Sequence, residues 1–192
     1  MSNVLKVSLQ EAIRCLHEKG WGQRRIAREL KPAGWVLFAR NVEEPKQVLE
    51  LNRELVDLSD RARPSMIALD QEGGRVSRLK LIGNEPPNAQ QLRDCGDLAL
   101  IRRHGDITGR ILRIFGFNLD LCPVLDISFD DEADNSLRGR CYGRDVAEVI
   151  QKASAFNDGG LIFGDEHFLC ATKQVESCIL KLETNFLADD LA

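Results

Sequence analysis

An aspartate that directly follows a short apolar run is the residue best suited to chemistry in this sequence. Asp70 comes after the run 65–69 and opens the polar, glycine-containing stretch Asp70-Gln71-Glu72-Gly73-Gly74-Arg75. A carboxylate at the end of a buried strand can accept hydrogen bonds from ligand hydroxyls, and the glycines let backbone approach a ligand closely. An ion pair with Arg75 or Arg78 would explain the same carboxylate. The residue types alone leave ligand binding and structural pairing open.

Three arginines form a second candidate cluster further along the chain, at Arg138, Arg140 and Arg144. A planar guanidinium is suited to paired hydrogen bonds with a carboxylate, a carbonyl or vicinal hydroxyls. Taken alone, the cluster is better explained as a solvated basic loop that nearby acids neutralise. Those acids are Asp130, Asp131, Glu132 and Asp134. Asp120 and Asp126 also follow an apolar run and are weaker candidates for a ligand site.

Neither a metal site nor a cofactor site is predicted. The six cysteines lie at positions 15, 95, 122, 141, 170 and 178, without a CxxC pair or a histidine at ligand spacing. This usage is typical of buried thiols without disulfides in a reducing compartment. We interpret His17 and His104 as structural residues of helices. The first twenty residues contain no apolar run of signal-peptide or membrane-spanning length, so we expect a cytoplasmic protein without a membrane partner.

Length and composition limit the classes of protein and partner. The 192 residues are 43% hydrophobic and 29% charged, which predicts one globular domain with a sizeable core. The 26 Lys and Arg against 30 Asp and Glu give a net charge of −4, so nucleic acid is not an expected partner. Residues 159–192 carry this whole net charge and contain no arginine. The composition therefore changes near residue 159.

Strands and helices alternate along the chain, which predicts parallel pairing and an α/β fold. The predicted strands are 34–39 and 65–69, both buried on both faces, and 117–121 with an extension over 124–127. The predicted helices are 8–19, which begins with a capping box, 45–61, 97–115 and 146–156. No G-x-G-x-x-G follows the first strand, and polar residues collect after successive strands, so a (β/α)8 (TIM) barrel is favoured over a doubly wound sheet. A closed barrel usually needs about 250 residues, so we expect a partial barrel, about the first half.

Four segments resemble one enzyme family. They are GWVLFARN at 34–41, ALDQEGGRVSRL at 68–79, FGFNLDLCPVLDI at 115–127 and RCYGRD at 140–145. Their order and spacing closely resemble the N-terminal half of glycoside hydrolase family 3 barrels, especially the bacterial β-N-acetylhexosaminidases. The resemblance covers about residues 30–158, around half of a family catalytic domain. It implies a glycosidase of cell-wall recycling that hydrolyses terminal β-linked N-acetylglucosamine, with a saccharide as partner.

The resemblance also implies which residues bind the sugar. Asp70 matches the family aspartate that binds sugar hydroxyls, Arg78 matches the arginine eight positions on, and Arg140 matches the arginine of an R-S-[FY]-G motif that here has Cys141 in place of Ser. His167 is the nearest counterpart of the histidine in the family's K-H-F-P-G segment, although Glu stands before it and no Pro-Gly follows. These four residues are the predicted substrate-binding set.

The resemblance weakens after residue 158, so we divide the chain into a half-barrel over 1–158 and a divergent acidic tail over 159–192. No Asp-x-His pair follows His167, and the family nucleophile belongs to a later strand, so no catalytic residue is assigned. We expect a truncated or frame-changed chain without glycosidase activity. A shortened paralogue with a repurposed tail is a second explanation of the same pattern. The alternative function is a non-catalytic half-barrel that binds sugar or associates with another chain, including self-association through its open edge.

Overall fold

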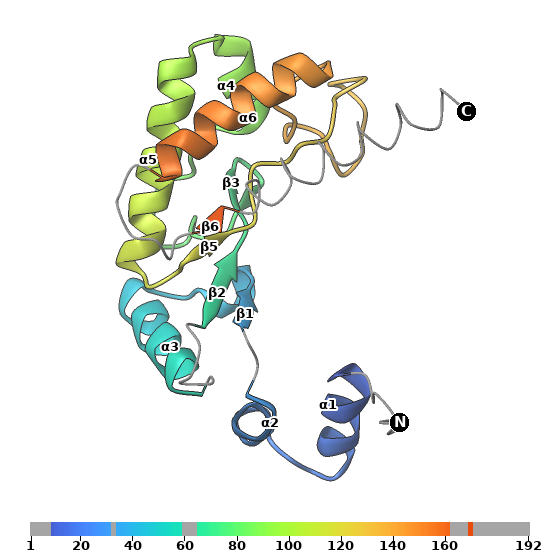
Figure 1. Ribbon diagram of the computed structural model, residues 1–192, viewed down its shortest axis with the longest axis vertical. Helices are drawn as coiled ribbons and strands as arrows, with labels where there is room; N and C mark the ends of the chain where they lie inside the picture. Colours follow the sequence, from blue (N-terminus) through green and yellow to red (C-terminus); the bar gives the residue numbers. More distant parts are fainter. Residues whose placement is uncertain (1–8, 32–33, 59–64, 162–168, 171–192) are drawn as a thin grey trace, which may run out of the picture.

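The computed structural model describes residues 9–31, 34–58, 65–161 and 169–170 (Figure 1). Its helices are α1 (Leu9–Glu18), α2 (Gln23–Leu30), α3 (Pro45–Leu58), α4 (Ala89–Cys95), α5 (Leu98–Ile114) and α6 (Val146–Leu161). Its strands are β1 (Gly34–Leu37), β2 (Met66–Leu69), β3 (Gln71–Gly73), β4 (Val76–Ser77), β5 (Leu119–Asp120) and β6 (Leu169–Cys170), with a short 3₁₀ turn at Ala39–Asn41.

The main sheet has the strand order β1-β2-β5-β6, and every pairing in it is parallel. Helices connect the successive strands, and Figure 1 shows α3 and α5 beside the sheet while α1 and α2 lie apart from it. The predicted α/β class and the partial barrel are confirmed. Among the described residues the sheet does not close.

A side chain extends the pairing of β2 with β5 beyond the short strand. Asn118 accepts a hydrogen bond from the backbone N–H of Ile67 through Oδ1 and donates one from Nδ2 to the carbonyl of Ser65, both 2.7 Å long. The carboxamide thus takes the place of a peptide group and fixes the register of the two strands. This register pairs Asp120 with Leu69, at the carboxyl end of β2 and next to the candidate site.

Only one face of the sheet is buried by helices. Leu37, Ile67 and Leu69 share a hydrophobic core with side chains of α3 and α5, whereas Val36 and Met66 are exposed. The prediction that the first two strands are buried on both faces is therefore wrong for β1, whereas in β2 the consecutive residues Ile67, Ala68 and Leu69 are all buried. It followed from continuous apolar runs, which two-sided burial and one-sided burial with an exposed apolar face both produce.

The two long helices α5 and α6 pack with their backbones in contact. A Cβ added at Gly105 would collide with the carbonyl of Phe156, and one added at Gly159 would collide with the carbonyl of Arg102. Glycine at both positions removes the side-chain layer that normally separates two helices. The close contact also forms the cover of β5 on the helix side of the sheet.

Several helices, strands and cysteines of the structure differ from the prediction. The structure adds α2, α4 and the β3–β4 hairpin, and it forms no strand over 124–127. Cys122 and Cys141 are buried thiols as expected, but Cys15 and Cys95 are exposed. The predicted cap at Ser8, the helix end at 59–61 and most of the tail lie outside the described residues. Among the described helices, none combines the length and apolar character needed to cross a bilayer.

Candidate functional site

Asp70 and Arg78 form an ion pair at the end of β2. Arg78 Nη2 donates to Asp70 Oδ2 over 3.0 Å, and both side chains are about three-quarters buried. The β3–β4 hairpin makes this possible, since Gly73 and Gly74 adopt φ angles of 95° and 53° that turn the chain back over the strand end. Arg75 instead points to backbone carbonyls of the loop after β5. The structural pairing considered for Asp70 is therefore real, and its partner is Arg78.

Gln71 stabilises the same hairpin through buried side-chain hydrogen bonds. Its Nε2 donates to Ser77 Oγ over 2.9 Å, and its Oε1 accepts from the backbone N–H of Leu79 over 3.1 Å. These buried hydrogen bonds hold the two short strands together, and they fix the segment that carries Arg78. The ion pair at the strand end is thus supported by a second set of contacts beneath it.

Arg140 is held by an acid that the sequence analysis did not select. Its Nε donates to Glu72 Oε2 and its Nη2 donates to Glu72 Oε1, both over 2.7 Å, and Nη1 reaches the carbonyl of Ser136 over 3.0 Å. The hydrogen bonds to buried Glu72 raise the pKa of Arg140, and the nearby charges of Asp70 and Asp126 add to the effect. Glu72 belongs to the same polar stretch as Asp70, which is the signal that could have identified it.

The other two arginines of the cluster, Arg138 and Arg144, pair with acidic side chains of the same loop. Arg144 binds Asp131 through Nε over 3.0 Å, and Arg138 lies 3.6 Å from a carboxylate oxygen of Glu132. Buried Arg93 of α4 makes a second, two-pronged contact with Asp131, over 2.9 and 2.7 Å. Hydrogen bonds from Arg93, Ser128 and Arg144 hold the pKa of Asp131 well below its usual range. The structure thus separates Arg140, which binds Glu72 of the hairpin, from Arg138 and Arg144, which pair with acids of their own loop.

Asp120 lies beneath the strand ends rather than among the candidate groups. It is almost fully buried, accepts hydrogen bonds from the backbone N–H of Gln71 and from Cys122 Sγ, both over 3.1 Å, and faces the α5–α6 side of the sheet. Burial raises its pKa to about 8, so the carboxyl is mainly protonated at neutral pH. Its contact with Gln71 fixes the backbone next to Asp70, which is a supporting role.

A cavity of about 240 Å³ opens beside the Arg140–Glu72 pair. It lies between the hairpin, the start of α4 and the loop after β5. Its walls are Gly73, Arg75, Asn88, Gln90, Arg138, Gly139 and Arg140. Asp70 and Arg78 are not among these walls. Two adjoining features therefore make up the candidate site, namely the Asp70–Arg78 pair at the strand end and the arginine-lined cavity next to it.

Two of the three histidines, His17 and His104, lie in the described part of the chain. His17 is exposed, and His104 is buried against the ring of Phe156, with a pKa lowered to about 4 by burial. The burial of His104 fits the structural role expected for it, and the role of His17 stays a prediction. His167 lies outside the described residues. Within the described ranges, no group of three or more His, Cys, Asp or Glu side chains is placed to hold a metal ion.

Comparison with known proteins agrees with this architecture. The chain is 31% identical over 150 residues to a β-hexosaminidase of Vibrio cholerae. The aligned region covers 76% of this chain and 44% of the relative. It is 33% identical over 145 residues to a β-hexosaminidase of Nitrosomonas eutropha, covering 70% of this chain and 40% of the relative. The chain thus spans less than half the length of these relatives.

Solved structures give the same result. A glycoside hydrolase family 3 β-N-acetylglucosaminidase from Paenibacillus sp. str. FPU-7 matches with a TM-score of 0.65 and 32% identity, over 71% of this chain and 26% of that one. NagZ from Neisseria gonorrhoeae, solved with N-trifluoroacetyl-D-glucosamine, matches with a TM-score of 0.59 and 25% identity. The match covers 73% of this chain and 43% of that one. Residues 22–170 match the model of the glycosyl hydrolase family 3 N terminal domain. The chain therefore belongs to glycosyl hydrolase family 3, as a part of its N-terminal domain.

Proposed function

We propose that this half-barrel binds a saccharide with a terminal N-acetylglucosamine at the carboxyl ends of its strands. The observation that carries the proposal is the pair of arginine–carboxylate contacts, Asp70 with Arg78 and Glu72 with Arg140, at the end of β2 in a chain of this family. Ligand-binding sites in parallel α/β folds form at the carboxyl ends of the strands.

The geometry supports a division of roles. Arg78 uses one carboxylate oxygen of Asp70, Oδ2, and so fixes the orientation of a group that can accept hydrogen bonds from sugar hydroxyls. Arg140 is fixed by Glu72 in the same way and lines the adjoining cavity, where its N–H groups can donate to ring-substituent oxygens. A pyranose carries both donors and acceptors, so a site with a carboxylate and a guanidinium side by side complements it. His167 is proposed as a further sugar contact, on the resemblance of its segment alone.

The activity proposed for the whole protein is hydrolysis of terminal β-linked N-acetylglucosamine, in cell-wall recycling in the cytoplasm. The hexosaminidase names of the relatives support this reaction class, and the thiol state of the described cysteines supports a reducing compartment. Within that protein, residues 1–158 supply the sugar-binding half of the barrel, and 159–192 form a divergent acidic segment. The nucleophile and the acid/base of a retaining mechanism are not assigned to this chain.

A second candidate function is a non-catalytic half-barrel that binds sugar or another polypeptide chain. The observation that favours it is the exposed apolar face of the sheet, which includes Val36 and Met66. In soluble proteins such a face often marks an interaction surface.

Calorimetric titration of the 192-residue chain with N-acetylglucosamine tests the main proposal. Asp70→Ala should weaken binding by about 1–3 kcal/mol, because sugar hydroxyls lose a charged acceptor. Asp57→Ala, which removes an exposed carboxylate from α3, should leave the affinity unchanged. Glucose, which lacks the acetamido group, serves as the comparison ligand. An unchanged isotherm for Asp70→Ala, or equal losses in both variants, would contradict the proposal.

A further inference from the structure

The arginine-lined cavity, of about 240 Å³, has three guanidinium groups and no carboxylate among its walls. Arg75 comes from the turn of the β3–β4 hairpin, and Arg138 and Arg140 come from the loop after β5. Asp70 and Asp126, whose charges act on Arg140, are not among these walls. Every wall lies within residues 73–140, and the walls other than the three arginines are uncharged.

Two of the three guanidinium groups share one backbone oxygen. Arg75 Nη2 donates to the carbonyl of Ser136, and Arg140 Nη1 donates to the same carbonyl over 3.0 Å. Arg75 Nη2 also donates to the carbonyl of Asn135 over 3.1 Å. The two cationic groups therefore lie within two hydrogen-bond lengths of each other, although like charges repel. An anion that contacts both groups would offset this repulsion.

The neighbouring acids balance the three positive charges only in part. Arg140 is neutralised by buried Glu72. Arg138 lies 3.6 Å from Glu132, whose side chain is 84% exposed, so water screens the charges of that pair. Arg75 binds backbone carbonyls, and in the described part of the chain no carboxylate is close enough to form an ion pair with it. Positive charge thus remains at the cavity.

The arginines also keep hydrogen-bond donors that a ligand can use. A guanidinium has five N–H donors. Arg140 makes two contacts with Glu72 and one with Ser136, so two of its donors have no partner among residues that the structure describes. Arg75 uses Nη2 only, so its Nε and Nη1 groups remain by the same count. Paired N–H donors with a positive charge suit the oxygen atoms of a carboxylate or a phosphate group.

Backbone hydrogen bonds hold the cavity walls together. The N–H of Gln90, at the start of α4, donates to the carbonyl of Gly139 over 3.3 Å. The N–H of Gly74, in the hairpin, donates to the carbonyl of Pro86 over 2.9 Å. Gly139 has a φ angle of 77°, a conformation that favours glycine. Because the walls are joined in this way, little conformational entropy is lost when a ligand binds between them.

We propose that the arginine-lined cavity binds an oxyanion, namely a carboxylate or phosphate group, between Arg75 and Arg140, with Arg138 as a third contact. The inference deepens the proposed function and rests on it, because the anion is an acidic substituent of the saccharide that binds at the Asp70–Arg78 pair. The site would thus favour acidic over neutral saccharides. A free anion such as phosphate has the same chemistry, and the experiment separates the two sources.

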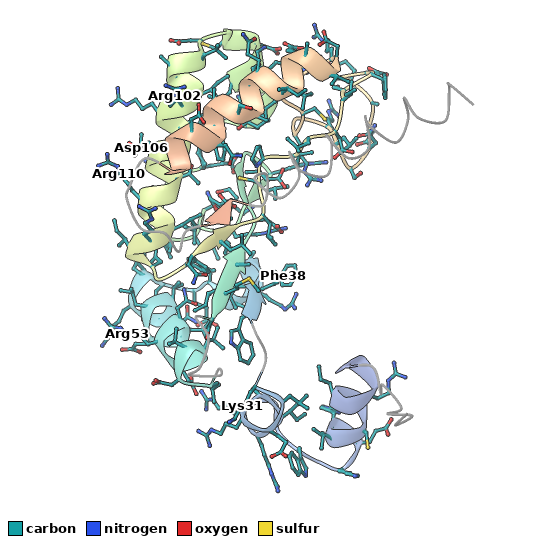
Figure 2. All side chains as sticks on the ribbon, viewed as in Figure 1. Lys31, Phe38, Arg53, Arg102, Asp106 and Arg110 are labelled. Atoms are coloured by element: carbon teal, nitrogen blue, oxygen red, sulfur yellow. The ribbon has the colours of Figure 1, made fainter. Side chains whose placement is uncertain are left out.

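Calorimetric titration with inorganic phosphate, in about 0.15 M NaCl to screen weak surface attraction, tests the oxyanion site. The wild-type chain should bind phosphate with a dissociation constant of about 1 mM or lower. Arg75→Gln should weaken this binding about tenfold or more, because one of two charge-assisted contacts is lost. Arg53→Gln is the matched control, since Arg53 is an exposed residue of α3 (Figure 2), and it should bind phosphate like the wild type.

A second titration identifies the source of the anion. N-acetylglucosamine 1-phosphate and 6-phosphate carry the charge at two different positions of the sugar. At least one of them should bind about tenfold more tightly than neutral N-acetylglucosamine, and Arg75→Gln should abolish this advantage without changing the affinity for the neutral sugar. Phosphate binding without any advantage of the sugar phosphates would overturn the assignment to a saccharide substituent and leave a site for free anions. Failure of the neutral sugar alone to bind would contradict the proposed function and not the oxyanion site.

Two controls separate the loss of an anion contact from a folding defect. Circular dichroism and urea denaturation of Arg75→Gln should match the wild type. Arg138→Gln changes a side chain that is half exposed, so it should fold normally and weaken phosphate binding about threefold or more. A folded wild-type chain that does not bind phosphate, or equal phosphate affinities of the wild type and both variants, would overturn the proposal.

Discussion

Arg140 binds the Glu72 carboxylate through two parallel hydrogen bonds, both 2.7 Å long, although the two residues are 68 positions apart in the sequence. The contact ties the loop after β5 to the β3–β4 hairpin, and Glu72 is buried where they meet. A guanidinium offers two donors in one plane, which an ammonium group cannot do. The fixed pair thus decides which donors of Arg140 face the adjoining cavity.

Arg140→Lys should lower the free energy of unfolding by about 1–3 kcal/mol, because a charge-assisted hydrogen bond to buried Glu72 is lost. Urea denaturation measures the change. Arg138→Lys is the matched control, since that side chain is half exposed and lies 3.6 Å from Glu132, and its effect should be close to zero. Equal stability of Arg140→Lys and the wild type would mean that the pair does not hold the loop.

The pH dependence of stability should reflect two buried groups with opposite effects. The pKa of Asp120 is raised to about 8, so between pH 4 and 8 the folded chain holds a proton that the unfolded chain releases, and stability falls as pH rises. The pKa of His104 is lowered to about 4, so between pH 4 and 6.5 the unfolded chain holds the extra proton, and stability rises with pH. The two slopes oppose each other up to about pH 6.5, and only that of Asp120 continues to about pH 8.

Asp120→Asn should therefore remove the fall in stability between about pH 6.5 and 8, and His104→Gln should make the wild-type fall begin near pH 4. Urea denaturation at a series of pH values tests both variants. A wild-type stability that rises from pH 6.5 to 8 would show that Asp120 is ionised in the folded chain.

Gly159→Ala should destabilise the chain by about 1–3 kcal/mol or more, because the new methyl group meets the carbonyl of Arg102 and forces α5 and α6 apart. Thermal or urea unfolding measures the loss. Gly83→Ala adds the same methyl group where the nearest atom, the carbonyl oxygen of Leu79, is 3.9 Å away, so it should cost little. Similar losses in both variants would argue against backbone contact between the two helices.

The 192-residue chain should show no hydrolysis of an aryl β-N-acetylglucosaminide above the uncatalysed rate. Sugar binding alone offers no route to cleavage, since a retaining mechanism needs a nucleophile and a proton donor, and the described strand ends supply sugar-binding candidates only. Release of the chromogenic aryl group measures turnover. Hydrolysis that is lost in Asp70→Ala would contradict the prediction, and it would mean that the chain contributes catalytic groups.

The sequence predicted the order of the main elements because their signals are local. The helices over 45–58, 98–114 and 146–161 have clear apolar periodicity or helix-start residues, and the strand before Asp70 is a short apolar run bounded by polar residues. The β3–β4 hairpin was missed because its strands are short and polar, and they are stabilised by Gln71, which makes contacts that no periodicity reports. The exposed apolar face of β1 was missed because its apolar run is continuous on both faces.

The candidate site was predictable only in part. Asp70 and Arg140 could be selected from their types and the family motifs, but the partner of each depends on tertiary structure. Arg78 reaches Asp70 through the turn at Gly73 and Gly74, and Glu72 meets Arg140 only after the loop beyond β5 has folded back. The sugar-binding role of these residues and of His167 stays a prediction.

The backbone contacts of α5 with α6, at Gly105 with Phe156 and at Gly159 with Arg102, have a consequence for motion. Two helices that touch through their backbones have no flexible side chains between them, so they fluctuate together as one rigid body. The segment that carries Arg140 begins after β5, which follows α5, and ends where α6 begins. The segment is thus attached to the central sheet at one end and to α6 at the other, which restricts its motion. The loss of conformational entropy needed to orient Arg140 occurs when the chain folds, and little remains to be lost when a ligand binds.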